Sequence, residues 1–114
     1  MIVEKKPVKL NSLQSKTLML LQLLARDPDS SSPVGDSGEV RITRLPHAHG
    51  NHMHVGQYVV ASRDASGLAN KSVWTALSRK GLVRENFEDE IILTPDGLNF
   101  STGLEKNFAA ASDH

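Results

Sequence analysis

The sequence predicts an α+β domain in which a small three-stranded antiparallel sheet packs on three to four helices. Two stretches, residues 11–26 and 68–80, repeat apolar residues at the spacing of a helix. Residues 82–94 hold two short apolar runs around a polar turn, which is typical of a β-hairpin. Of the 114 residues, 39% are hydrophobic, enough for one modest core. We therefore expect an N-terminal arm over residues 1–10, a single domain over 11–108 and a disordered tail over 109–114.

The composition of the chain limits its surroundings. Thirteen basic residues balance thirteen acidic ones, so no overall field attracts nucleic acid or an anionic membrane, and any such binding would depend on local charge. The absence of cysteine excludes disulfides and thiolate metal sites and is typical of a reducing compartment. The longest apolar run, residues 18–25, is too short to cross a membrane, and no apolar signal segment follows the first residues. We expect a soluble, cytoplasmic protein without membrane contact.

The first helix is predicted to start at Asn11 or Ser12 and to end near Arg26. A short polar side chain at its start can accept a hydrogen bond from a backbone N–H of the first turn. Pro7 interrupts the residues before it, which we interpret as the arm. The apolar residues cover a broad face, and Gln22 lies opposite or beside it. That face consists of Leu13, Leu18, Leu20, Leu21, Leu24 and Ala25.

The middle of the chain gives weaker patterns. Residues 27–38, DPDSSSPVGDSG, are rich in Asp, Ser, Pro and Gly and predict a mobile loop. Residues 39–45 alternate in character and predict a short strand that ends before Pro46. Residues 46–54, PHAHGNHMH, predict a second, irregular mobile loop. Residues 55–63 are compatible with a helix or a strand, because their spacing does not decide between the two while their β-branched residues favour a strand.

The second helix is predicted over residues 69–80. Val73, Trp74 and Leu77 recur at helical spacing, and Gly81 stands where a helix C-cap belongs. Trp74 is expected in the core or at a domain interface rather than as a platform for base stacking, because it follows Val73 on the buried side of this helix. We expect Val73, Leu77, Leu82 and Ile92 to form one buried cluster.

A hairpin and a final helix complete the expected order. The hairpin strands are residues 82–86 and 90–94, separated by the polar FEDE. Pro95 suits the first turn of a helix, and the weak helix formers Gly97 and Gly103 lie within the predicted segment. The residues expected to pack from this helix are Leu98, Phe100, Leu104 and Phe108.

The stretch SVWTALSRKGLVREN, followed by IILTPDGLNF, resembles the recognition-helix and wing region of MarR-like and PadR-like bacterial transcriptional regulators. The shared pattern is an amphipathic helix ending in a leucine, a basic pair and Gly-Leu-Val, then a short hairpin closing with Leu-Thr-x-x-Gly. Here it consists of Leu77, Arg79, Lys80, Gly81, Leu82 and Val83, then Leu93, Thr94, Pro95 and Gly97. The resemblance lies mainly in residues 68–104 and implies a winged helix-turn-helix fold. In that scheme residues 56–64 would form the helix before the recognition helix.

The resemblance also implies a DNA-binding function in transcription regulation, with helix 69–80 in the major groove of double-stranded DNA. Lys71 and Arg79 can neutralise phosphates or donate to guanine, and Asn70 can pair with adenine. Arg84, at the base of the hairpin, can reach the adjacent backbone. The expected DNA-binding residues are Asn70, Lys71, Ser72, Thr75, Ser78, Arg79 and Arg84.

Acidic residues near the hairpin tip favour a second interpretation. Glu85, Glu88, Asp89 and Glu90 would repel phosphate where members of the family often carry Arg or Lys. The balanced net charge points the same way. The alternative is a winged-helix module that contacts a protein partner and does not bind DNA.

Four histidines, His47, His49, His52 and His54, lie within eight residues. Imidazole is a common ligand of transition metals. Four ligands on so short a flexible segment would have difficulty closing a tetrahedral shell, and no nearby Cys, Asp or Glu completes a familiar spacing. We therefore expect a polar loop with no bound metal, and no other cofactor.

The sequence predicts no enzymatic activity. It lacks a Gly-rich phosphate loop, a Gly-x-Ser-x-Gly motif and a cysteine nucleophile. Asp64, Ser66 and the histidines do not have a spacing that indicates a catalytic triad.

The number of large apolar residues in the terminal helices predicts a homodimer. The leucines of the first helix and the apolar residues of the last exceed what we expect a small monomeric core to absorb. The resemblance to dimeric regulators implies the same association through the terminal helices.

Overall fold

The structure, a computed structural model, describes residues 8–56, 58–85 and 90–104. Its elements confirm the predicted α+β class and number more strands than expected. In chain order they are α1 (Ser12–Ala25), β1 (Ser31–Pro33), β2 (Val40–Ile42), β3 (Ala48–His49), β4 (His52–Val55), β5 (Tyr58–Ala61), the 3-10 helix η1 (Ser62–Ala69), α2 (Lys71–Arg79), β6 (Val83–Glu85), β7 (Ile91–Leu93) and α3 (Pro95–Asn99).

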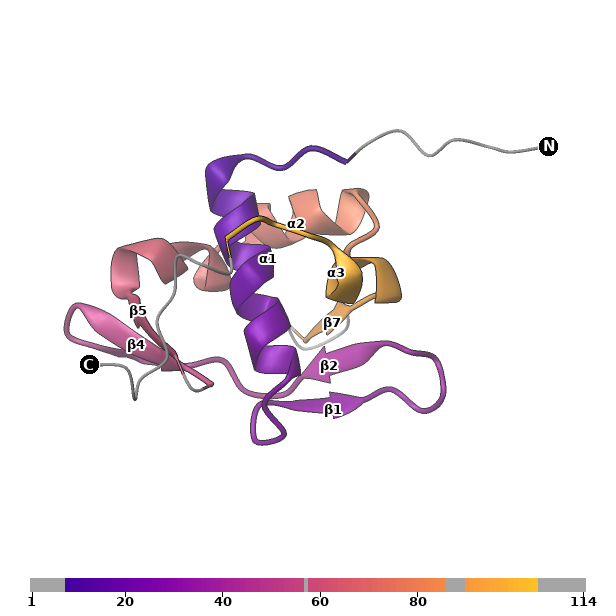
Figure 1. The fold of residues 1–114 in the computed structure, drawn as a ribbon, viewed down its shortest axis with the longest axis horizontal. Helices are drawn as coiled ribbons and strands as arrows, with labels where there is room; N and C mark the ends of the chain where they lie inside the picture. The colour runs from indigo at the N-terminus through magenta and orange to yellow at the C-terminus, as the bar shows by residue number, and fades with distance from the viewer. Residues whose placement is uncertain (1–7, 57, 86–89, 105–114) are drawn as a thin grey trace.

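Helix α1 runs through the middle of the molecule, with β4 and β5 on one side and β1, β2 and α3 towards the other (Figure 1). Its predicted start is confirmed, because the Asn11 side chain accepts a hydrogen bond from the backbone N–H of Gln14 and the Gln14 side chain accepts one from Asn11. Every residue from Thr17 to Leu24 is buried. A helix buried on all sides is typical of the centre of a core and not of its surface.

The expectation that Gln22 lies on a polar face of α1 is wrong. Gln22 is buried, and its side-chain N–H groups donate to the backbone carbonyls of Gly97 and Phe100, both at 2.8 Å. These carbonyls belong to α3 and to the residue that follows it, where helical backbone bonding ends. The amide therefore ties α1 to α3.

The main sheet has four antiparallel strands in the order β1-β2-β7-β6, and not the three that the sequence predicts. The additional strand, β1, lies inside residues 27–38, which we expected to be loop throughout. Ser31 and Pro33 in β1 pair with Ile42 and Val40 in β2. Ladder hydrogen bonds join backbone groups, and an edge strand tolerates proline, so this polar segment forms a strand without an apolar face.

The expected cluster of Val73, Leu77, Leu82 and Ile92 needs one correction. The first three belong to the main core, but Ile92 does not, although it is 1% exposed. Successive side chains of a strand point to opposite faces, so Ile91 and Leu93 face the core while Ile92 lies on the outer face of the sheet. There Arg41 of β2 and Arg84 of β6 are its cross-strand neighbours.

A second sheet, in the order β3-β4-β5, fills residues 48–61. The prediction of an irregular loop over residues 46–54 is wrong, because most of the segment forms the hairpin of β3 and β4. Strand β5 settles the open assignment of residues 55–63: its residues Tyr58–Ala61 are extended. Met53, Val55 and Val60 are buried in the core, so one face of this sheet packs against the rest of the domain.

Between β5 and α2 lies η1 instead of the α-helix over residues 56–64 that the family scheme implies. Gly67 in η1 is buried against α1, and a Cβ at this position would overlap the side chain of Thr17. The hydroxyl of Thr17 donates to the carbonyl of Leu13, 2.8 Å away. This close approach lets η1 pack directly on α1.

The elements after η1 agree with the sequence until α3. Helix α2 and the strands β6 and β7 occupy the predicted positions, and Trp74 is buried as expected. Helix α3 ends at Asn99 because Phe100 is extended, so the expectation that it continues is wrong for residues 100–104. Leu98, Phe100 and Leu104 pack against the core as partly buried residues. Phe108, the arm residues 1–7 and the tail 109–114 lie outside the described residues.

The large apolar residues that the structure describes are almost all buried or half-buried within one chain. Leu18, Leu20, Leu21 and Leu24 are at most 1% exposed, and Val8 is the one large apolar residue among those described that is exposed. The prediction of a homodimer rests on an excess of apolar surface, and that excess is not found in the described residues. None of the helices in the described part of the chain is long and apolar enough to cross a membrane.

Candidate functional site

The predicted DNA-binding residues centre on α2, which follows η1 after a single residue, Asn70. The Asn70 side chain accepts a hydrogen bond from the backbone N–H of Ser72 at 3.0 Å and caps α2. This contact occupies the amide oxygen that bidentate pairing with adenine would also need. Asn70 therefore begins the helix, and the expected helix 69–80 is shortened to Lys71–Arg79.

The remaining predicted residues of α2 share one face. At about 100° per residue, they occupy a sector of roughly 120° on the helical projection, opposite the three buried residues. The buried residues are Val73, Trp74 and Leu77, and the opposite sector holds Lys71, Ser72, Thr75, Ser78 and Arg79. Lys71, Ser72 and Arg79 are exposed, while Thr75 and Ser78 are half-buried. The structure therefore brings these five side chains together on a polar surface.

Lys71 lies at the edge of this surface. Its ammonium group is 4.6 Å from the centre of the Trp74 ring, within the range of a cation–π interaction. Trp74 is 3% exposed, and its indole N–H is buried without a hydrogen-bond partner among the described residues. The ring thus belongs to the core and also helps to position the cation of Lys71 at the start of α2.

Arg84 is not part of this surface group, because its guanidinium is held by Glu39. Its Nε and Nη2 groups donate to the two carboxylate oxygens of Glu39, each at 2.9 Å. The bidentate hydrogen bond lowers the pKa of the Glu39 carboxyl from its usual value and raises that of Arg84. A phosphate would have to compete with Glu39 for the guanidinium.

The acidic residues of the hairpin are only partly described. Glu85 is exposed on β6, next to Arg84, and Glu90 is 3.2 Å from the Nε of Arg41 on β2. Glu88 and Asp89 lie outside the described residues. Two carboxylates thus pair with arginines, Glu90 with Arg41 and Glu39 with Arg84, whereas Glu85 is exposed to solvent.

The histidines lie on a regular hairpin. Met53 and Val55 of β4 are buried, so the alternation of the strand places His52 and His54 on the opposite, outer face. His49 of β3 is the cross-strand partner of His52. As their side chains are placed, no group of three or more His, Cys, Asp or Glu within the described residues is arranged to hold a metal ion.

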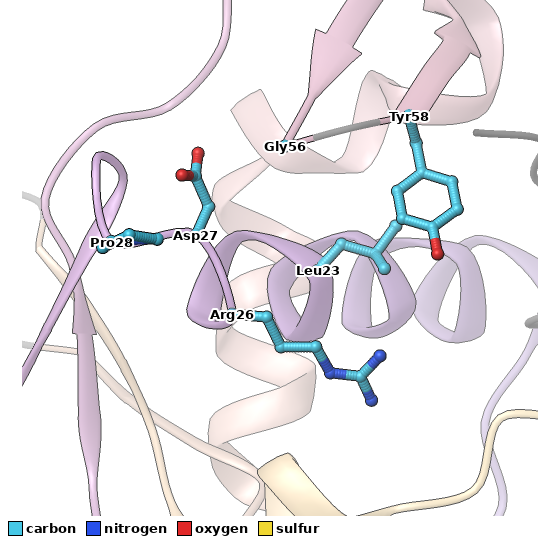
Figure 2. Close-up of a pocket in the computed structure, with 6 residues that line it drawn as sticks. All are labelled: Leu23, Arg26, Asp27, Pro28, Gly56 and Tyr58. Carbon is cyan, nitrogen blue, oxygen red and sulfur yellow. The ribbon is translucent and has the colours of Figure 1, made fainter. Parts of the chain in front are cut away.

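A pocket of about 240 Å³ opens between the end of α1 and the turn from β4 to β5. Its six lining residues are shown in Figure 2: Leu23, Arg26, Asp27, Pro28, Gly56 and Tyr58. Asp27 already accepts hydrogen bonds from the Ser30 hydroxyl and the Asp29 backbone, so it stabilises the turn after α1. Sequence reasoning missed this pocket, because no local pattern indicates that residues 23–28 meet Gly56 and Tyr58.

Asp64, one of the residues considered for a catalytic triad, has another partner. Asp64 accepts a hydrogen bond from the ammonium group of Lys16 on α1 at 2.9 Å. This ion pair joins η1 to α1.

Comparisons with family models, with curated proteins and with solved structures give no match for this chain.

Proposed function

We propose that this protein binds double-stranded DNA as a winged helix-turn-helix transcriptional regulator, with α2 as its recognition helix. Support for the winged-helix arrangement comes from the order of elements: η1, α2 and then the β6–β7 hairpin, whose strand β7 pairs with β2. This agrees with the resemblance of residues 68–104 to MarR-like and PadR-like regulators. The β3-β4-β5 sheet stands between β2 and η1 as an insertion into that order.

The observation that carries the DNA-binding proposal is the exposed polar face of α2. Lys71 and Arg79 lie two turns apart on it, and Ser72, Thr75 and Ser78 provide small hydroxyl groups between them. An α-helix fits the major groove of B-DNA, where cationic side chains contact phosphates or guanine and small side chains permit close approach. No residue of α2 is acidic.

The test is binding to a mixed-sequence duplex at low salt, measured by fluorescence anisotropy. Lys71→Glu and Arg79→Glu are each expected to weaken binding at least tenfold. Loss of one phosphate contact reduces the slope of log K against log salt by about 1. Arg44→Glu is the matched control, because it makes the same charge change at an exposed residue between β2 and β3. Binding that is insensitive to the α2 variants, or equally sensitive to Arg44→Glu, would contradict this docking face.

One observation favours a second candidate function, a winged-helix module that docks a protein. Arg84 is neutralised by Glu39, and exposed Glu85 follows it on β6, so a phosphate that approached Arg84 would meet two carboxylates beside it. Absence of duplex binding at low salt, with the chain folded, would favour this alternative over DNA binding.

A further inference from the structure

The outer face of the β3–β4 hairpin brings three imidazole rings close together. The ring centres of His49, His52 and His54 are 5.4 to 6.1 Å apart. Two imidazoles bound to one tetrahedral ion have ring centres on the order of 5 Å apart, from a metal–nitrogen bond of about 2.1 Å. The ring separations are therefore within about an ångström of that value.

The backbone, and not the chance rotation of side chains, creates this grouping. His49 and His52 are directly cross-strand, and His52 and His54 are alternate residues of β4. Burial of Met53 and Val55 fixes which face they occupy, because a slip of one residue would expose both apolar side chains. His47 lies directly before β3 and is exposed, so it is a candidate for a fourth ligand.

We propose that His49, His52 and His54 form a surface site for a divalent transition-metal ion of the type that prefers imidazole, such as Zn²⁺. The nitrogen atoms do not converge in the present rotamers, but His49 and His54 are exposed and His52 is half-buried. Rotation of exposed side chains is fast and has little steric hindrance, so an arriving ion can draw the three rings together. Water or His47 completes the tetrahedral shell. The site is independent of DNA binding by α2.

The experiment is thermal unfolding of the full, tag-free chain at pH 7.5 with Zn²⁺ or with a chelator. An ion that binds the folded hairpin raises Tm, on the order of 10 °C when free Zn²⁺ exceeds Kd about a hundredfold. Histidines that bind zinc equally well in the unfolded chain give no such rise. This readout therefore separates a site built by the fold from a merely histidine-rich segment.

Four variants complete the test. His49→Gln, His52→Gln and His54→Gln are each expected to abolish the zinc-dependent rise while leaving Tm in chelator within a few degrees of the parent value, because these side chains are on the outer face. His114→Gln is the matched control, since it removes the one histidine far from the hairpin in the sequence, and it is expected to retain the rise. The proposal is overturned if the parent chain shows no rise, if the rise survives in the three hairpin variants, or if His114→Gln loses it too. Should one hairpin variant fold poorly in chelator, the other two decide.

Discussion

The two hairpins of this protein, β6–β7 and β3–β4, each bury one face, and their outer faces carry side chains of different kinds. On the outer face of the four-stranded sheet, Ile92 is sealed between Arg41 and Arg84, and each arginine pairs with a carboxylate. On the outer face of the three-stranded sheet, the outward-facing positions of β3 and β4 carry histidines whose rings lie close together. The first face therefore pairs its arginines with carboxylates, whereas the second presents several imidazoles.

The packing around a glycine also differs between the root of β6–β7 and the tip of β3–β4. At the root of β6–β7, a Cβ on Gly97 would overlap the backbone carbonyl of Leu82. At the turn of β3–β4, Gly50 has no atom within 4 Å of the position a Cβ would take. The root of one hairpin is packed against backbone, while the tip of the other is open to solvent.

The largest expected effect follows from this difference in packing. Gly97→Ala should destabilise the protein by about 3 kcal/mol or more, because a backbone carbonyl cannot move aside as a flexible side chain can. Gly50→Ala should cost only about 1 kcal/mol, because its φ of +68° strains a residue with a Cβ but meets no obstacle. The free energy of unfolding in urea measures both. Equal losses for the two variants would show that the roots and tips of the hairpins do not differ as described.

A smaller effect is expected from the two outer faces themselves. Ile92→Ala should lower the free energy of unfolding by about 2–4 kcal/mol, since it leaves a cavity beneath the two arginines. His54→Ala on the outer face of β4 should change it by less than about 0.5 kcal/mol, because the side chain is exposed. Urea unfolding in the presence of a chelator gives the comparison without any contribution from metal. If the histidine substitution cost as much as the isoleucine one, the outer face of β4 would be structural.

The parts of the fold that the sequence predicted are those determined locally. Asn11 caps α1, Gly81 ends the turn after α2, and the apolar runs around FEDE form β6 and β7, because each signal lies within a few residues of the element it specifies. Strand β1 and the β3–β4 hairpin were missed because their polar side chains resemble a loop, while what forms them is backbone pairing with another strand.

The candidate site shows the same limit. The polar face of α2 followed from helical periodicity. The ion pair between Arg84 and Glu39 could not be predicted in this way, since the two residues are 45 positions apart and meet only because β2, β7 and β6 are neighbours in the sheet. Likewise, the sequence predicts a surface position for the polar side chain of Gln22, because its hydrogen-bond partner in α3 is distant in the sequence. Grouping of the histidines on one face required the register of a hairpin that the sequence did not predict.

The smallest expected effect is the pH dependence that the pair of Glu39 and Arg84 gives to the outer face of the four-stranded sheet. Because the folded pKa of Glu39 lies below its usual value of 4.5, the pair stabilises the fold above that value, and the contribution is lost as the pH falls through the lowered pKa. Glu39→Gln should therefore have a shallower decline in its urea midpoint between about pH 5 and pH 3 than the parent chain. Glu85→Gln, which removes an exposed carboxylate from the residue next to Arg84, is the matched control and should leave the decline nearly unchanged. If Glu39→Gln and the parent lost stability in parallel, the bidentate contact would not persist in solution and Arg84 would be available to a phosphate. The contrast between the two outer faces would then rest on Ile92 and on the pair of Arg41 and Glu90.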